Sequence, residues 1–155
     1  MSQEVADQCT QLKDNYRFFR YLDKEETAVV TGYLQCQFVS AGQVLWNEGD
    51  PSDRAAFVVD GRVEIKKQTE FVGKHVIVGI YGQGSIVGEL CLLSGEPRAV
   101  TATALIDTSL LMLSRKQFDL LLEEHPDLGA KLLKGMFLAL STRLRKSFER
   151  LASVF

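Results

Sequence analysis

Six glycines divide the middle of this chain into short apolar segments, and this punctuation limits its possible folds more than any other feature. The glycines stand at positions 42, 49, 61, 73, 82 and 84. The apolar segments between them are Gln43–Asn47, Ala55–Asp60, Arg62–Lys67, Lys74–Tyr81, Arg98–Ala104 and Ser109–Leu113. Each has the length of a strand, and Asp60-Gly61 between two of them is typical of a tight hairpin turn. Residues 35–114 are therefore predicted to form an antiparallel sandwich or barrel.

Helical patterns flank this region on both sides. Before it, Asp23 followed by Glu26 marks a helix start, and after it Ser114 with Gln117 predicts a second capping box. Pro126 suits the first turn of a long final helix. Apolar residues expected in the N-terminal helical cap are Val5, Cys9, Leu12, Phe18, Phe19 and Leu22. The final helix carries a stripe at alternating spacings of four and three, through Leu133, Phe137, Leu140, Leu144, Ser147 and Leu151.

Length and composition favour one domain that needs no metal ion or disulfide for its stability. The 155 residues divide into a helical segment (1–34), a β-rich segment (35–114) and C-terminal helices (115–155). A net charge of -2 lacks the basic footprint of a nucleic-acid-binding chain. No apolar run reaches the roughly 18 residues of a membrane span, and the N-terminus carries no signal-peptide pattern. Cysteines at positions 9, 36 and 91 include no Cys-x-x-Cys pair. We therefore expect a cytoplasmic protein with no nucleic-acid or membrane partner.

Residues for catalysis are scarce. The two histidines, His75 and His125, lie in no metal-binding or nucleophile motif. The glycine-rich stretch Gly82–Gly88 has the wrong spacing for a dinucleotide loop, and strands rather than a crossover helix follow it. A metal enzyme on a jelly-roll scaffold, such as a cupin, would need metal-binding histidines that this pattern lacks. The sequence predicts no catalytic residue, no metal and no cofactor.

The most informative stretch is Gly88–Thr101, in which Glu89 opens one short helical turn and Arg98 begins a strand after a proline. Backbone amides at the start of a helix attract anions, and arginine grips phosphate in bidentate fashion. A carboxylate such as Glu89 accepts hydrogen bonds from sugar hydroxyls. Together these groups describe a site for a nucleotide monophosphate. The alternative, left open by the residues alone, is that Glu89 and Arg98 pair with each other across a turn.

The same stretch resembles the phosphate-binding cassette of the cyclic nucleotide-binding domain family. Its pattern of Gly-Glu-Leu, a short helix and then Pro-Arg-Ala-x-Thr stands here as Gly88-Glu89-Leu90 and Pro97-Arg98-Ala99-Val100-Thr101. The spaced glycines, the segment Val58–Ile65 and the flanking helices also match, over roughly residues 15 to 150. The resemblance implies an α+β fold. It is an antiparallel β-roll or jelly roll of about eight strands, with N-terminal helices, a short phosphate-binding helix and a long C-terminal helix.

The resemblance also implies roles for individual residues. Glu89 would accept the ribose 2'-hydroxyl, Arg98 would bind the exocyclic oxygens of the cyclic phosphate, and Gly88 would let the ribose lie against the main chain. The remaining contacts would be the amides of Cys91 and Ala99 and the side chains of Val87 and Leu90. Val87 departs from the family pattern, because many members carry an aromatic residue there.

The base is expected to be adenine. Members that prefer cyclic GMP often have a threonine after the cassette arginine, and Ala99 stands at that position here. The resemblance therefore favours cyclic AMP, with cyclic GMP as the alternative. Base contacts usually come from the terminal helix, where Arg145, Ser147 and Phe148 lie within one turn.

In this family, ligand binding shifts the terminal helix between a docked and a released position. We expect a sensor module of this kind, with an unidentified effector protein and a homodimer formed through the C-terminal helix. The chain ends at Phe155 with no kinase, channel or helix-turn-helix module, so it either acts through a partner or belongs to a longer protein. A ligand-independent interaction domain of the same fold is the alternative function.

Overall fold

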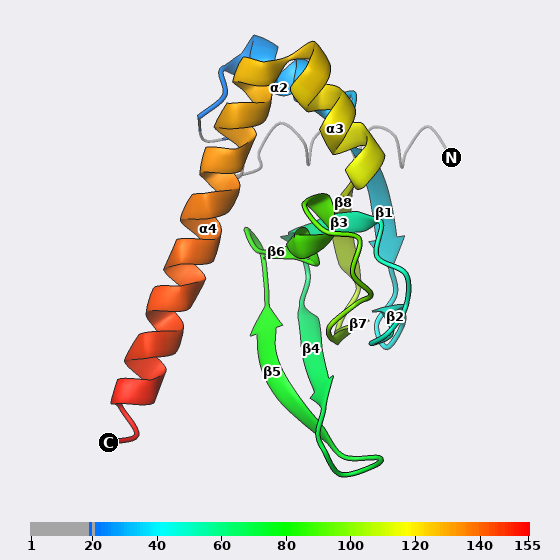
Figure 1. The fold of residues 1–155 in the computed structure, drawn as a ribbon, viewed down its shortest axis with the longest axis vertical. Coiled ribbons are helices and arrows are strands. Elements are labelled where there is room, and N and C mark those ends of the chain that lie inside the picture. Colours follow the sequence, from blue (N-terminus) through cyan, green and yellow to red (C-terminus); the bar gives the residue numbers. More distant parts are fainter. Residues whose placement is uncertain (1–18, 20) are drawn as a thin grey trace.

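The computed structural model describes residue 19 and residues 21–155 (Figure 1). Core positions expected at Val5, Cys9, Leu12 and Phe18 lie outside the described residues, whereas Phe19 is buried. The helices are α2 (Lys24–Thr31), the one-turn 3-10 helix η2 (Glu89–Leu92), α3 (Arg115–Glu124) and α4 (Pro126–Ala152). The strands are β1 (Gln35–Val39), β2 (Val44–Trp46), β3 (Arg54–Asp60), β4 (Val63–Gln68), β5 (His75–Tyr81), β6 (Ile86–Val87), β7 (Thr101–Ala104) and β8 (Thr108–Ser114).

The eight strands form two antiparallel sheets of four, in the orders β1-β8-β3-β6 and β2-β7-β4-β5. The predicted antiparallel β-roll with a short inner helix and a long C-terminal helix is therefore confirmed. Figure 1 shows α3 and α4 leaving the strands at one end of the molecule, with α4 running back beside them.

Strand β3 supplies side chains to two separate hydrophobic cores. Ala55, Phe57 and Val59 pack in the core shared with the helices. Ala56 and Val58, which alternate with them, pack in the core between the two sheets. Strand β8 alternates in the same way. Because side chains on a strand point to opposite faces in turn, the sheet that contains β3 and β8 is the middle of three layers.

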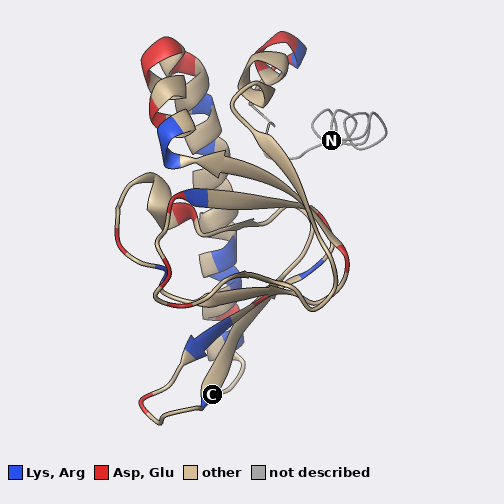
Figure 2. Cartoon of the chain, turned by 90° about the vertical axis from the view of Figure 1, so that its right-hand side faces the viewer, with Lys and Arg blue, Asp and Glu red and all other residues tan. Residues whose placement is uncertain are grey.

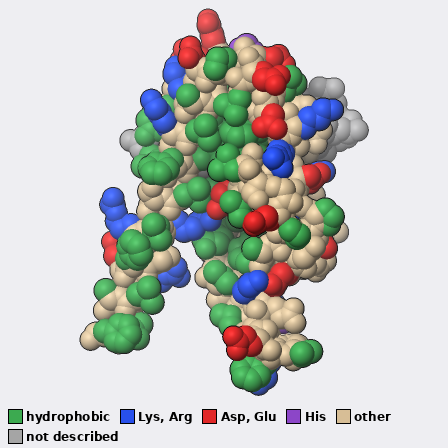
Figure 3. All heavy atoms as spheres, in the orientation of Figure 1, with side chains coloured by type: hydrophobic (Ala, Val, Ile, Leu, Met, Phe, Trp, Pro, Cys, Tyr) green, Lys and Arg blue, Asp and Glu red, His purple; other side chains and the backbone are tan. Residues whose placement is uncertain are grey.

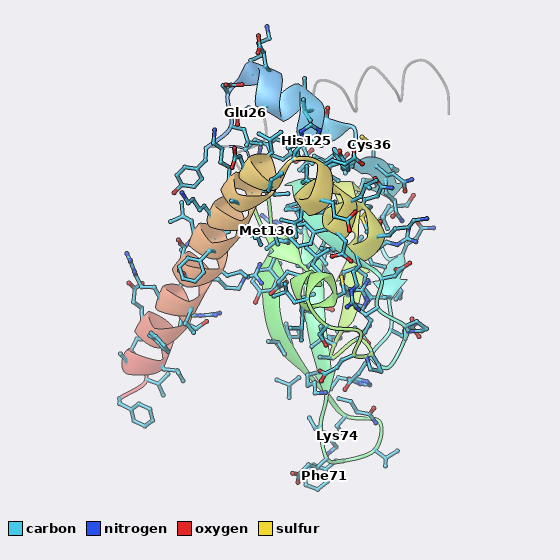
Figure 4. All side chains as sticks on the ribbon, turned by 45° about the horizontal axis from the view of Figure 1, so that its top comes forward. Glu26, Cys36, Phe71, Lys74, His125 and Met136 are labelled. Carbon is cyan, nitrogen blue, oxygen red and sulfur yellow. The ribbon has the colours of Figure 1, made fainter. Side chains whose placement is uncertain are left out.

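The turn at Asp60-Gly61 is tight, but the predicted hairpin at this position is wrong. Strands β3 and β4 belong to different sheets, so the turn carries the chain from one sheet to the other. Gly61 has a φ of 113°, and a Cβ there would lie 2.7 Å from the Cα of Thr108. The close approach of the two layers, rather than hairpin pairing, therefore requires glycine here. The long hairpin is β4–β5, whose projecting tip carries Phe71 and Lys74 (Figure 4).

Both predicted helix starts are observed. The Asp23 carboxylate accepts a hydrogen bond from the Glu26 amide at 2.8 Å, and the Ser114 hydroxyl accepts one from the Gln117 amide at 3.1 Å. Figure 2 shows acidic residues gathered where α3 meets α4 and basic residues along the rest of α4. At this acidic end, the Lys131 ammonium binds both carboxylate oxygens of Glu26, at 2.8 and 2.7 Å. The first half of α4 is therefore tied to α2.

The apolar stripe predicted on α4 divides between core and solvent. Leu133 and Leu140 pack against the core, whereas Phe137 and Leu144 are 74% and 55% exposed. The fully packed positions are instead Leu132 and Met136. Met136 lies on the face of α4 turned to the strands (Figure 4). The outer half of α4 stands apart from the strands and carries hydrophobic side chains (Figure 3). Among the described helices, none is long and apolar enough to cross a membrane.

Candidate functional site

Gly88 is the N-cap residue directly before the one-turn helix η2, and its position leaves no room for a side chain. Gly88 has a φ of 71°, in the left-handed region that favours glycine. A Cβ there would lie 2.5 Å from Arg98 Nη1 and 2.9 Å from the ring of Trp46. The Gly88 main chain, the Arg98 guanidinium and the Trp46 indole therefore form a compact group at the start of η2.

Arg98 is the centre of this group, and its side chain is almost fully enclosed. Its exposed fraction is 6%. Nη2 donates to the carbonyl of Arg54 at 2.7 Å, Nη1 donates to the carbonyl of Gly88 at 3.5 Å, and Nε has no partner. The guanidinium carbon lies 3.7 Å from the centre of the Trp46 ring, which is the geometry of a cation–π contact.

No carboxylate among the described residues forms an ion pair with Arg98. The Asp53 carboxylate pairs with Arg54 instead, at 3.1 Å. Burial lowers the pKa of the Arg98 guanidinium, since a charged group loses hydration in the interior. The backbone is fixed as well, because the Arg98 amide donates to the Asp50 carbonyl and the Gly49 amide donates to the Arg98 carbonyl, both at 2.8 Å. The result is a buried cation that is held by its backbone and forms no ion pair with a carboxylate of the described residues.

Glu89 does not pair with Arg98, so the alternative of a simple pair across the turn is wrong. The Glu89 carboxylate lies 3.9 Å from Arg143 Nη1 on α4, and its side chain is 28% exposed. A partly exposed carboxylate on the first residue of η2, with one long ion-pair contact, is able to accept hydrogen bonds from a hydroxyl-bearing ligand.

Arg143 connects the middle of α4 to the strands around the site through three side-chain contacts. Its guanidinium lies 4.1 Å from the centre of the Tyr81 ring and donates a hydrogen bond to the carbonyl of Ile86. With the contact to Glu89, one side chain joins α4 to β5, β6 and η2. Among the described residues, Arg143 is the one arginine that links α4 to the predicted cassette.

A cleft of about 1230 Å³ opens beside Arg143, between α4 and the segment that joins β5 to β6. Its strand-side wall is residues 79–85, and its helix-side wall includes Thr142, Lys146 and Arg150. The predicted base contacts do not line this cleft. Arg145 and Phe148 are exposed, and the Ser147 hydroxyl donates to the carbonyl of Arg143 at 3.1 Å.

The other predicted ligand residues lie close in sequence but face different ways. Val87 is 2% exposed and packs between the two sheets, so its side chain supports the site from behind. Leu90 is exposed, as is Ala99, whose carbonyl accepts a hydrogen bond from Lys67 at 3.0 Å. Cys91 is buried in the core beneath the helices, and burial raises the pKa of its thiol, which disfavours the reactive thiolate.

Three residues of this arrangement were not predicted. The strand pattern around Trp46 predicts no more than a core residue. Nothing in the neighbouring sequence indicates that a cation lies on the face of its ring. Tyr81 closes an apolar strand in the same way. Arg143 had a usable signal, because it lies one helical turn before Ser147 and therefore on the same face of the helix.

Comparison with known proteins supports the predicted family. A sequence model described as the cyclic nucleotide-binding domain matches residues 36–125. A lysophospholipase (nte1) of Aspergillus oryzae is 40% identical over 97 residues, which are 62% of this chain and 6% of that protein. The corresponding protein of Aspergillus terreus is 37% identical over 113 residues, which are 72% of this chain and 7% of that protein. The chain thus spans only a small part of the length of these relatives.

Solved structures agree with the fold. A cyclic nucleotide-binding domain from Methylobacillus flagellatus has a TM-score of 0.81 at 26% identity, over 98% of this chain and 85% of its own. The catabolite activator protein of Thermus thermophilus has a TM-score of 0.71 at 26% identity, over 89% of this chain and 62% of its own. The regulatory domain of Toxoplasma gondii protein kinase A, crystallised with cAMP, has a TM-score of 0.61 at 27% identity, over 77% of this chain and 45% of its own.

Replacing Arg143 by alanine is expected to release the outer half of α4 in the ligand-free chain. The variant loses the hydrogen bond to Ile86, the contact with the Tyr81 ring and the attraction of Glu89. Amide hydrogen exchange over residues 140–152 should accelerate about tenfold, the scale of one cation–π contact and one hydrogen bond. Arg145→Ala is the matched control, since it removes the same charge from an exposed position. Equal exchange in the two variants would contradict the anchoring role.

Proposed function

Because the chain belongs to the cyclic nucleotide-binding domain family, we propose that it binds a cyclic nucleoside monophosphate in the segment Gly88–Ala99 and acts as a sensor module. The observation that carries this proposal is the buried guanidinium of Arg98, which is 6% exposed and has no carboxylate partner among the described residues. Buried charges in proteins are normally paired. A singly charged cyclic phosphate is an anion of suitable size and charge to complete the pair.

The neighbouring groups suit the rest of such a ligand. The partly exposed Glu89 carboxylate would accept the ribose 2'-hydroxyl, and Gly88 allows the sugar to approach the main chain. The amides of Cys91 and Ala99 would add phosphate contacts. From the ribose, the base would extend toward α4 and the cleft beside Arg143. The open cleft supports a base held partly by α4, with Arg145 or Ser147 contributing after a movement of this helix.

We propose cyclic AMP as the preferred ligand. Ala99 offers no hydroxyl to a guanine base, and its exposed position leaves it accessible to a ligand. Cyclic GMP is the competing ligand.

Ligand binding would be coupled to α4 through Glu89. In the ligand-free arrangement, the Glu89 carboxylate attracts Arg143, which also holds Ile86 and Tyr81. A ribose hydroxyl on Glu89 would change that attraction and therefore the balance between docked and released α4. A ligand can shift a two-state balance only if it contacts the two states differently, and this carboxylate provides such a difference.

The proposed role is regulatory rather than catalytic. The matched segment belongs to a family whose domains generally act by binding, and the chain covers only 6% of the Aspergillus oryzae lysophospholipase. An effector protein or an attached domain would convert the movement of α4 into an output. The three cysteines, with no Cys-x-x-Cys pair among them, support a reducing compartment such as the cytoplasm. A ligand-independent domain would have no use for an unpaired buried cation.

Arg98→Ala is expected to weaken cyclic AMP binding by about 30-fold or more. Removing one member of a buried, hydrogen-bonded charge pair typically costs about 2–5 kcal/mol. Arg98→Lys should also lose affinity, since lysine lacks the planar fork of donors. Titration calorimetry of both variants measures the loss, with Arg62→Ala as a control that removes the same charge from an exposed position. Near-normal affinity of a folded Arg98→Ala variant would dispose of the phosphate assignment.

Ala99→Thr is expected to narrow or invert the preference for cyclic AMP over cyclic GMP. The added hydroxyl can bond a guanine, and one such bond contributes about 1–2 kcal/mol. Ala99→Val is the matched control, because valine has the shape of threonine without the hydroxyl. Competition binding with both nucleotides gives the selectivity ratio. A wild-type chain that prefers cyclic GMP, or equal effects of Thr and Val, would show that position 99 does not read the base.

We further propose that the exposed stripe of α4 joins two copies of the chain. Phe137, Leu144, Phe148 and Leu151 are each more than half exposed. Exposed apolar surface of this kind marks interfaces, and a two-fold helix–helix contact is the commonest arrangement. The stripe is short, so the dissociation constant should be on the order of micromolar.

Sedimentation velocity tests the dimer over a concentration series with and without cyclic AMP. Leu144→Asp should shift the chain to monomer, whereas Val72→Asp, at a 94% exposed position on the β4–β5 tip, should not. A monomer under all conditions, unchanged by Leu144→Asp, would leave α4 as an intramolecular lid.

A further inference from the structure

Trp46 lies at the end of β2 and presents one face of its indole to Arg98. The ring is 7% exposed, and the guanidinium carbon lies 3.7 Å from its centre. The pairing of β2 with β7 shifts register between Val44 and Trp46, and such irregularities re-aim side chains out of the regular alternation. Its cross-strand partner is Ala102, which is fully buried and small enough to leave room for an indole.

Two polar atoms in this contact have no hydrogen-bond partner although they are buried. They are Nε of Arg98 and Nε1 of Trp46, and they are the buried side-chain nitrogen and oxygen atoms without a partner in the described part of the chain. Buried donors are nearly always satisfied in native proteins. Both unsatisfied donors therefore belong to a single stacked pair, at the position where an anionic ligand is proposed to bind.

The indole also restricts how the guanidinium can move. Trp46 covers one face of the group, and Nη2 is held in the plane of the fork by the Arg54 carbonyl. The Gly88 main chain lies against the same pair, since a Cβ on Gly88 would be 2.5 Å from Arg98 Nη1 and 2.9 Å from the Trp46 ring, and this leaves the fork little space to turn. The fork is therefore oriented before the ligand arrives, which lowers the cost of ordering it on binding.

We propose that Trp46 is a positioning residue for phosphate recognition. It holds the Arg98 guanidinium by its π face in the orientation that binds the phosphate of the ligand. This inference rests on the proposed cyclic nucleotide function and adds a residue that acts through Arg98. An aliphatic side chain in this place would fill the volume but would neither attract the cation nor fix its plane.

Substitution of Trp46 separates positioning from packing. Trp46→Leu should weaken cyclic AMP binding about tenfold, the scale of a desolvated cation–π contact. Trp46→Phe, which keeps an aromatic face, should stay within about threefold of wild type. Phe118→Leu is the control for lost core volume, because Phe118 is 1% exposed and packs in the other core. It should lower the melting temperature without changing affinity.

The outcomes of this titration differ for the two claims. A wild-type chain that binds no cyclic nucleotide would overturn the proposed function together with this inference. Normal affinity of Trp46→Leu, in a wild-type background that does bind, would overturn the positioning role alone. A loss of affinity in Phe118→Leu equal to that in Trp46→Leu would attribute the effect to core packing and would also overturn it.

Fluorescence gives a signature that a purely structural tryptophan would lack. Trp46 is the chain's one tryptophan, so its emission reports this ring alone. Cyclic AMP should shift the emission with the same midpoint as the calorimetric titration, because the phosphate neutralises the cation on the ring. In the ligand-free chain, Arg98→Ala should change the emission and Arg62→Ala should not. An emission that is unchanged at ligand saturation would contradict the proposal.

Discussion

The guanidinium of Arg98 is a buried positive charge that forms no ion pair with a carboxylate of residues 19 and 21–155. Its compensation consists of two backbone carbonyls, from Arg54 and Gly88, and the face of one indole ring. Burying a charge costs several kcal/mol unless it is paired and hydrogen-bonded. The surrounding structure provides that support through the Gly49–Asp50 loop, which bonds the Arg98 backbone on both sides. Gly88, which has no side chain, allows the start of η2 to lie directly against Arg98 and Trp46.

The rest of the molecule divides into a packed frame and the exposed end of α4. The middle sheet is packed on both faces, through the alternation of Phe57 and Val58 on β3, and it carries the site on a fixed frame. The first half of α4 belongs to that frame through Leu132, Met136 and the pair between Lys131 and Glu26. Beyond Arg143 the helix has mainly exposed side chains (Figure 3). Arg143 therefore lies at the boundary between the packed half of α4 and its exposed half.

Much of this arrangement could be predicted from sequence, because it depends on local patterns. The Asp23 and Ser114 caps, the strand segments and the turn at Gly88-Glu89 each follow from a few adjacent residues. The hairpin at Asp60-Gly61 was predicted wrongly because a tight turn specifies a reversal of the chain and not the sheet that receives it. The partners of Trp46 and Arg143 could not be predicted, since they lie 52 and 54 positions away, at Arg98 and Glu89. The most deeply buried positions of α4, Leu132 and Met136, each lie one residue before a position of the predicted stripe. Both sets satisfy helical spacing, so the sequence could not decide between them.

The central claim is that Arg98, a buried cation with no carboxylate partner in the described part of the chain, receives the phosphate of a cyclic nucleotide. Calorimetric titration of the unmodified chain with cyclic AMP, cyclic GMP and inorganic phosphate tests it most directly. The account predicts one molecule of cyclic AMP bound per chain, more weakly bound cyclic GMP, and much weaker binding of inorganic phosphate, which lacks the ribose that Glu89 would hold. Absence of binding by both cyclic nucleotides, with a folded chain, would contradict it.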